Sequence, residues 1–195
     1  MNNQAKNTAE RILDVTQDLI QRRGYNAISF NHIAEKVGIK KPSIVHHFPG
    51  KADLGKAVVK RYREVFSAAL QAIAEDDQKT AMDAFDFYCT PYLDYGGDKE
   101  KICLCGALAG EFLALPKVMQ KEVAAFFDGH LRWLEDILKR GLENGEFHFT
   151  GKPAAMAQLV LDTLQGALIV KRATGTSGHV VEVMKTLRSK LEKPE

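Results

Sequence analysis

The stretch SFNHIAEKVGIKKPSIVHHFPGKADL, residues 29–54, holds the pattern that decides the fold of this 195-residue chain. Ser29 is a residue type that favours the N-cap of a helix, and Gly38 can adopt the positive φ that ends one. Pro42 suits the first turn of a second helix, reaching to about His47, because its missing N–H costs nothing there. The stretch therefore predicts two short helices joined by a tight turn.

Helical spacing of apolar residues extends in both directions from this stretch. Upstream, apolar residues from Ala9 to Ile20 form one face of a longer helix, for which Asn7 is a candidate N-cap. Downstream, a long helix starts near Ala52, and further helices are expected at about 79–94, 103–114, 117–143, 153–173 and 179–192. Only Glu146–Phe149 alternates weakly in the manner of a strand. The sequence predicts an all-α fold of about nine helices.

The charge is divided unevenly along the chain. The net charge is only +2, yet residues 1–63 hold 12 Lys/Arg against 5 Asp/Glu, and residues 64–195 hold 15 against 20. We expect a three-helix head over residues 1–51 that meets a polyanion, and a helical body over residues 52–195 that does not. Composition alone leaves open a basic surface that is merely solvated.

Two short helices with a tight turn, behind a longer helix, form the helix-turn-helix pattern of DNA-binding proteins. The second helix is short enough to lie in a major groove about 12 Å wide. Lysines such as Lys40 can contact phosphates, and Ser43, Val45 and Pro42 can contact base edges or thymine methyl groups. An ordinary helical hairpin with a basic rim would show a similar pattern.

The N-terminal region resembles the TetR-type repressors over about 50 residues without a gap. The similarity runs from Ala9-Glu10-Arg11-Ile12-Leu13 through Val37-Gly38-Ile39 to Lys51-Ala52-Asp53-Leu54. The resemblance implies a homodimeric, ligand-released transcriptional repressor with one DNA-reading head per subunit. Its implied phosphate contacts are Ser43, His47 and Lys51, and its implied base contacts are Asn31, Lys41, Pro42 and Val45. Val45 stands where the family usually has a tyrosine, which removes a phosphate and stacking contact.

The predicted partner of the head is double-stranded operator DNA. The candidate DNA-binding residues are Ser29, Asn31, Lys40, Lys41, Pro42, Ser43, Val45, His46, His47 and Lys51. A metal site at the two histidines is disfavoured, because adjacent residues on a helix point roughly 100° apart. The sequence predicts no metal and no cofactor.

The body carries a cluster of large side chains, and the resemblance implies a small-molecule effector pocket among them. The candidate effector-binding residues are Phe66, Leu70, Phe85, Tyr88, Cys103, Phe112, Phe126, His130 and Trp133. Aromatic residues at helical spacing usually form plain core, and His130 is more often a satisfied core histidine than a ligand contact. The resemblance also implies a homodimer through the helices at about 153–173 and 179–192.

Cys103 is a candidate redox sensor. A cysteine at a helix N-terminus has its thiolate stabilised by the helix dipole, and Lys99 and Lys101 lie nearby in sequence. The stretch is similar to thiol-sensing repressors of the TetR type, in which a lysine at the position of Lys171 accompanies the cysteine. The alternative is that the cysteines are small packing residues, as we expect for Cys89.

Other function classes lack sequence support. The sequence has no strand-turn-helix phosphate loop and no H-E-x-x-H motif, so we predict that the chain is not an enzyme; the alternative is a helical-bundle thiol enzyme using Cys103. The longest run without a charged residue, Gly24–Ala34, has 11 residues, short of the about 20 that a spanning helix needs. We expect a cytoplasmic protein with no membrane partner.

Overall fold

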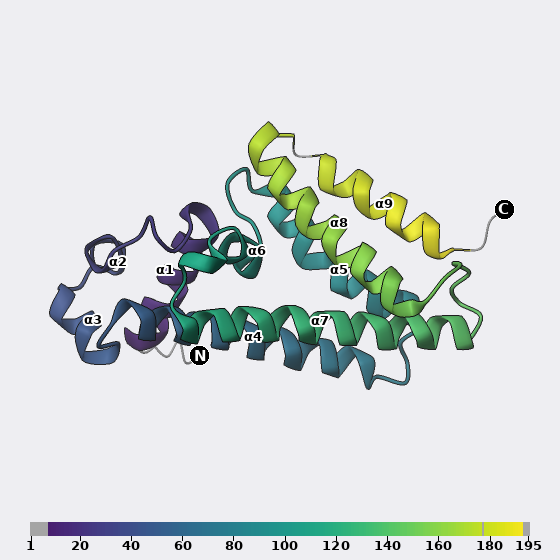
Figure 1. Cartoon of the computed structure of the whole chain (residues 1–195), viewed down its shortest axis with the longest axis horizontal. Coiled ribbons are helices and arrows are strands. Elements are labelled where there is room, and N and C mark those ends of the chain that lie inside the picture. The colour runs from purple at the N-terminus through teal and green to yellow at the C-terminus, as the bar shows by residue number, and fades with distance from the viewer. Residues whose placement is uncertain (1–7, 177, 193–195) are drawn as a thin grey trace, which may run out of the picture. The chain divides into compact units, whose positions relative to one another are not determined.

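The computed structural model describes residues 8–176 and 178–192, and this part of the chain holds nine α-helices, one short 3₁₀ helix and no strand (Figure 1). The all-α prediction is confirmed, and the weak strand signal at Glu146–Phe149 was wrong, because that segment is irregular. Asn7, the candidate N-cap, lies outside the described residues. The elements are α1 (Thr8–Arg23), α2 (Phe30–Val37), α3 (Lys41–His47), α4 (Lys51–Ala74), α5 (Ala81–Gly97), α6 (Leu104–Ala109), η1 (Phe112–Ala114), α7 (Lys117–Glu143), α8 (Pro153–Thr174) and α9 (His179–Leu191).

The chain folds into two compact units. The first unit contains the residues up to Arg63 together with Leu104–Ala124. The second unit contains Glu64–Cys103 and the residues from Ala125 onward. The division falls inside α4 and α7, so each of these helices contributes to both units.

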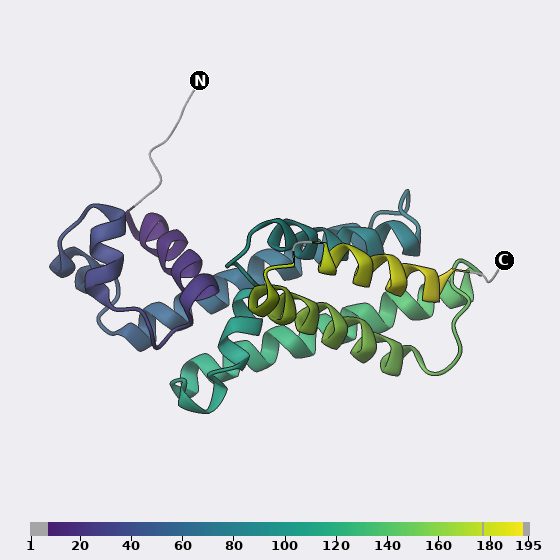
Figure 2. The same ribbon diagram turned by 90° about the horizontal axis from the view of Figure 1, so that it is seen from above.

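In the first unit, α1, α2 and α3 pack around a small apolar core (Figure 2). The side chains of Ile12, Ile33 and Ile44, one from each helix, are fully buried. The hydroxyl of Ser29 caps α2 by accepting a hydrogen bond from the backbone N–H of His32 at 3.3 Å. Gly38 ends the helix with φ 75°, as the sequence predicted. The three helices thus form the expected helix-turn-helix.

Charged groups fasten further segments to this core. Arg61 of α4 forms ion pairs with Glu10 at 2.7 Å and with Asp14 at 2.9 Å, both on α1. The carboxylate of Glu111, just before η1, accepts hydrogen bonds from the backbone and side-chain nitrogens of Asn26, each at 2.9 Å. This contact links the segment after α6 to the turn after α1. Sequence spacing gave no indication of it, since the two residues are far apart in the chain.

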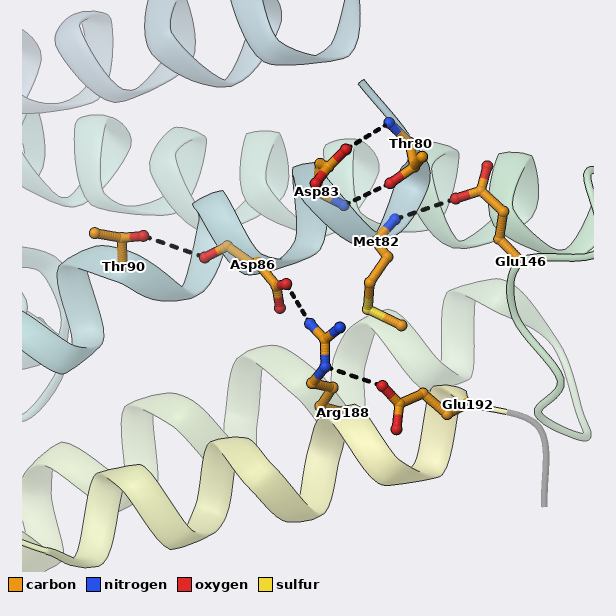
Figure 3. A network of polar contacts seen from close by, with 8 residues as sticks. All are labelled: Thr80, Met82, Asp83, Asp86, Thr90, Glu146, Arg188 and Glu192. Atoms are coloured by element: carbon orange, nitrogen blue, oxygen red, sulfur yellow. Dashed lines mark hydrogen bonds and ion pairs between the residues drawn. The ribbon is translucent and has the colours of Figure 1, made fainter. Parts of the chain in front are cut away.

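In the second unit, α8 packs against α9 and α5. Figure 3 shows the ion pair that joins α9 to α5, in which the guanidinium of Arg188 pairs with Asp86. The Nε of Arg188 also pairs with Glu192, the C-cap of α9, at 2.9 Å. The start of α5 is fixed by a capping box, in which Thr80 and Asp83 each accept a backbone hydrogen bond from the other.

Two expectations about the body were wrong in detail. The helix expected at 103–114 is divided into the six-residue α6 and the separate η1, because Gly110 follows α6 and Glu111 makes a long-range contact with Asn26. Val65 occupies an apolar position in the helical spacing of the long helix that starts near Ala52, which predicts an inward side chain, but it is 61% exposed. The break matters for Cys103, since a helix of six residues offers it a much weaker dipole than the predicted one.

Helix α8 is long and apolar enough, by length and composition alone, to cross a membrane; among the described helices it alone passes this test. A helix buried inside a helical domain passes the same test. The apolar side chains of Val160, Leu164 and Leu168 are buried within the second unit, which is typical of such a helix.

Candidate DNA interface and effector site

The outer face of α3 is polar and accessible. The side chains of Lys41, Ser43, His46 and His47 are exposed, as is that of Pro42, and Val45 is 40% exposed. Ile44 points the other way and is fully buried, which fixes the rotation of the helix about its axis. Because a helix turns by roughly 100° per residue, burial of this one residue sends the flanking residues outward. Their placement agrees with the predicted reading face.

The remaining candidate DNA-binding residues of the head differ in their exposure and in the contacts they already make. Asn31 and Lys40 are exposed. Ser29 is half-buried, and its hydroxyl is engaged as the cap of α2. The ammonium of Lys51 lies 4.3 Å from the centre of the Tyr25 ring, a cation–π contact. Burial lowers the pKa of Lys51, and the negative charge of Glu111 opposes this shift.

The histidines of α3 lie edge to face, with ring centroids 5.3 Å apart. Within residues 8–176 and 178–192, no group of three or more His, Cys, Asp or Glu side chains is arranged to hold a metal ion.

Several of the candidate effector residues meet in one aromatic cluster inside the second unit. The ring centroid of His130 lies 3.9 Å from that of Phe126, 5.6 Å from that of Tyr88 and 6.3 Å from that of Phe66. Trp133 stacks on Tyr88 at 5.5 Å with an interplanar angle of 16°. The indole N–H of Trp133 donates to the carbonyl of Leu70 at 2.8 Å, which ties the indole to α4.

Two predicted effector residues do not join this cluster. Phe85 is buried on α5 and lines a shallow depression with the α9 residues Val181, Met184 and Arg188. Phe112 belongs to the first unit, where it is half-buried in η1. Sequence periodicity identifies large apolar residues but not the neighbours they meet, so these two were grouped with the rest.

Lys171 of α8 is almost completely buried, and its ammonium group is held by backbone carbonyls. Nζ donates to the carbonyls of Tyr95 at 2.9 Å and Lys101 at 3.1 Å, and also to that of Asp98. Burial lowers the pKa of Lys171, and Asp98 opposes the shift. The lysine therefore orders the segment that leads into Cys103, whose side chain is itself only 3% exposed.

The other two cysteines are also buried. Cys89 and Cys105 are fully inaccessible, and burial raises the pKa of Cys89 to about 12. The expectation that Cys89 is buried is confirmed. A thiol with such a pKa is not a nucleophile near neutral pH, since only the thiolate reacts.

Two polar residues that were not among the candidate effector residues lie beside the aromatic cluster. Tyr92 follows Tyr88 by one helical turn, and their hydroxyls are 3.5 Å apart. The side-chain amide of Gln165, on α8, donates to the Tyr92 hydroxyl at 3.1 Å. No sequence pattern distinguished Gln165 from the other glutamine of this helix, Gln158.

A helix-turn-helix head with an exposed reading helix, joined to a helical body, defines the class of one-component DNA-binding regulators. Comparison with known protein families identifies the family within this class. Residues 12–58 match the family described as "Bacterial regulatory proteins, tetR family", and residues 81–187 match "Tetracyclin repressor-like, C-terminal domain". The chain belongs to the TetR family of transcriptional regulators, and the predicted family and function class are confirmed.

Known relatives and structures are similar along nearly the whole chain. An uncharacterised helix-turn-helix-type transcriptional regulator of Lactococcus lactis is 25% identical and covers 96% of this chain and 95% of its own length. The transcriptional repressor NemR of Escherichia coli is 24% identical over 82% of this chain and 81% of its own. A TetR transcriptional regulator from Legionella pneumophila superimposes with a TM-score of 0.87 at 30% identity, over 97% of this chain and 100% of its own.

Proposed function

We propose that this chain is a homodimeric, effector-released repressor, with an operator-binding domain over residues 1–51 and an effector-binding and dimerisation domain over residues 52–195. The observation that carries the proposal is the exposed polar face of α3, set by the buried Ile44. TetR-family regulators bind operator DNA, dimerise and bind small-molecule effectors. In this proposal the protein acts in the cytoplasm, and its partners are double-stranded DNA and an effector.

Exposed apolar residues on α8 and α9 support the dimer. Leu159, Ile169 and Val170 of α8 are each 45% to 52% exposed, and Val181 of α9 is 40% exposed. Helices that leave such residues in water are candidates for burial against a second copy. A two-fold dimer would present two reading helices, and simultaneous binding to two half-sites would give the affinity that one small head lacks.

Release from DNA requires that the effector bind more tightly to a conformation that does not fit the operator. A preference of about 100-fold corresponds to about 2.7 kcal/mol, enough to shift the population of a two-state protein. The aromatic cluster around His130 is the proposed effector site, with Phe66, Leu70 and Trp133 at its border. The proposed site lies wholly within the second unit.

An electrophoretic mobility shift with the DNA upstream of the protein's own gene tests the proposal. We expect Lys41→Ala to weaken binding and to relax sequence preference, because Lys41 is exposed on the reading face. The matched control is Lys139→Ala, which removes an exposed lysine of α7 that pairs only weakly with Glu143 at 3.9 Å. Equal binding by the wild type and the Lys41 variant would contradict the assigned reading face.

Cys103 is a second candidate route for the effector signal. Similarity to NemR and the contacts of Lys171 with the segment before Cys103 favour a thiol that responds to electrophiles. Because Cys103 is only 3% exposed, an electrophile can reach its thiol only when the surrounding segment opens locally. The same burial disfavours a thiol enzyme, in which a substrate must reach the nucleophile in every turnover. We expect Cys103→Ser to abolish release from DNA by an alkylating agent such as N-ethylmaleimide. If N-ethylmaleimide still releases the Cys103→Ser variant from DNA, Cys103 is a packing residue and not a sensor.

A further inference from the structure

Four polar side chains form a hydrogen-bonded chain inside the second unit, running from α7 through α5 to α8. His130 Nδ1 lies 3.2 Å from the Tyr88 hydroxyl, which lies 3.5 Å from the Tyr92 hydroxyl. Gln165 Nε2 donates to Tyr92 at 3.1 Å. The first three side chains are at most 5% exposed. One end of this hydrogen-bonded chain is therefore the partly buried amide of Gln165, and the other end is the buried imidazole of His130.

The direction of this chain follows from its amide end. An amide N–H can only donate, so the Tyr92 oxygen accepts from Gln165. Each hydroxyl uses both its donor and its acceptor capacity if Tyr92 donates to Tyr88 and Tyr88 donates to His130 Nδ1. The reverse direction would leave the Tyr92 proton without an acceptor in the described part of the chain. Since a neutral imidazole carries one proton, the proton of His130 then lies on Nε2.

The far end of the chain is an unused donor. His130 Nε2 is buried and has no hydrogen-bond partner among residues 8–176 and 178–192. His130 is only 5% exposed, and its ring lies beside those of Phe126 and Phe66, which cannot satisfy an N–H as a carbonyl oxygen does. Burial lowers the pKa of His130 to about 4, so the ring stays neutral near pH 7. A buried donor left unpaired costs folding free energy, and such groups concentrate at functional sites.

We propose that His130 Nε2–H is the hydrogen-bond donor for an uncharged, mainly apolar effector that carries an acceptor oxygen, such as an aromatic ketone. This inference rests on the proposed function, because it assigns the ligand class of the same effector site. Phe66 and Phe126 supply the apolar walls, and Tyr88 holds the imidazole in the donating tautomer. A carboxylate effector is disfavoured, because His130 is neutral and supplies no positive charge.

Ligand titration on the full chain tests the proposal with a matched pair of probes. Acetophenone and α-methylstyrene have nearly the same shape, but only acetophenone has an acceptor oxygen. Trp133 is the single tryptophan and stacks on Tyr88, so its fluorescence reports on the site. We expect acetophenone to bind about threefold to tenfold more tightly, which is the value of one neutral hydrogen bond. His130→Phe should abolish the preference, and His148→Phe, at an exposed histidine, should keep it.

Nitrogen-15 NMR of the ligand-free protein tests the tautomer independently of any ligand. We expect the His130 signals to show a protonated Nε2, and the same spectrum of Tyr88→Phe to show loss of the fixed tautomer. If His130→Phe does not fold, Tyr88→Phe serves in the titration, where it should reduce the preference for acetophenone.

Three results would overturn the proposal: an Nδ1–H tautomer, equal or absent binding of the two probes, or tighter binding of the donor-only probe indole. DNA binding is measured on the same preparation. If the protein binds its operator but fails these tests, the ligand class is wrong and the repressor function stands. If it does not bind DNA, the proposed function itself fails.

Discussion

Lowering the pH should destabilise this protein through His130 in a window where few other buried groups titrate. Burial lowers the pKa of His130 from 6.5 to about 4. Between these values the unfolded chain binds a proton and the folded protein does not, so the free energy of unfolding falls as the pH falls. For these two values, the loss between about pH 7 and about pH 5 is about 2 kcal/mol.

The other titratable groups around the ring do not interfere. Burial raises the pKa of both Tyr88 and Tyr92, so neither hydroxyl loses its proton in this window. Cys89, whose pKa is raised to about 12, also stays neutral. Outside this cluster, in the capping box of α5, Asp83 has a pKa below its ordinary value of 3.8, mainly because it accepts a hydrogen bond from the backbone of Thr80. The predicted slope therefore belongs to His130.

Urea unfolding followed by circular dichroism measures the effect. The wild type, His130→Phe and His148→Phe are compared at both pH values, at one protein concentration, because dimerisation would make stability concentration-dependent. We expect the wild type and the His148 variant to lose about 2 kcal/mol more than His130→Phe on acidification. Equal losses in all three proteins would refute the assignment of a buried, neutral imidazole.

Three further predictions concern single side chains. Lys51→Ala should reduce the slope of log DNA affinity against log salt concentration by about 0.9 for any DNA sequence, measured by salt titration. An unchanged slope would mean that the ammonium of Lys51 stays with the Tyr25 ring and does not contact a phosphate. Glu111→Gln should lower the free energy of unfolding by about 1 kcal/mol in urea, since it weakens two charge-assisted hydrogen bonds, and no change would show that these bonds do not form in solution. Gly141→Ala should lower the free energy of unfolding by about 1–3 kcal/mol, because the added Cβ would lie 2.1 Å from the Phe147 ring. Gly129→Ala, on the same helix, has free space for the Cβ and should raise it by about 0.5–1 kcal/mol. Shifts of the two melting temperatures in the same direction would contradict this contrast.

The head was predictable because its determinants are local. Ser29, Gly38 and Pro42 act within a few residues of their own position through caps, a positive φ and a fixed φ. Burial of Ile44 follows from the apolar period, and it sets the exposed face of α3. The bounds of α7, 117–143, were also correct, since its long amphipathic pattern outweighs its two internal glycines.

The body site was only partly predictable. Sequence spacing selected His130 as a polar residue on an apolar face. The hydrogen bond of Nδ1 to Tyr88, and the burial of Nε2 without a partner among the described residues, arise only when α5 and α7 pack together. Phe85 and Phe112 were indistinguishable in sequence from the clustered aromatics, because apolar periodicity carries no information about which helix is opposite.

The sequence by itself determined most of the helices, the caps of α2 and the exposed face of α3, because these arise from backbone preferences and periodicity over short distances. Only the tertiary structure decided that Gln165, Tyr92, Tyr88 and His130 form one polar chain, and that the ammonium of Lys171 is held by carbonyls before Cys103. Hydrogen bonds between residues far apart in the chain require specific side-chain geometry, which packing of the helices creates and no local pattern encodes.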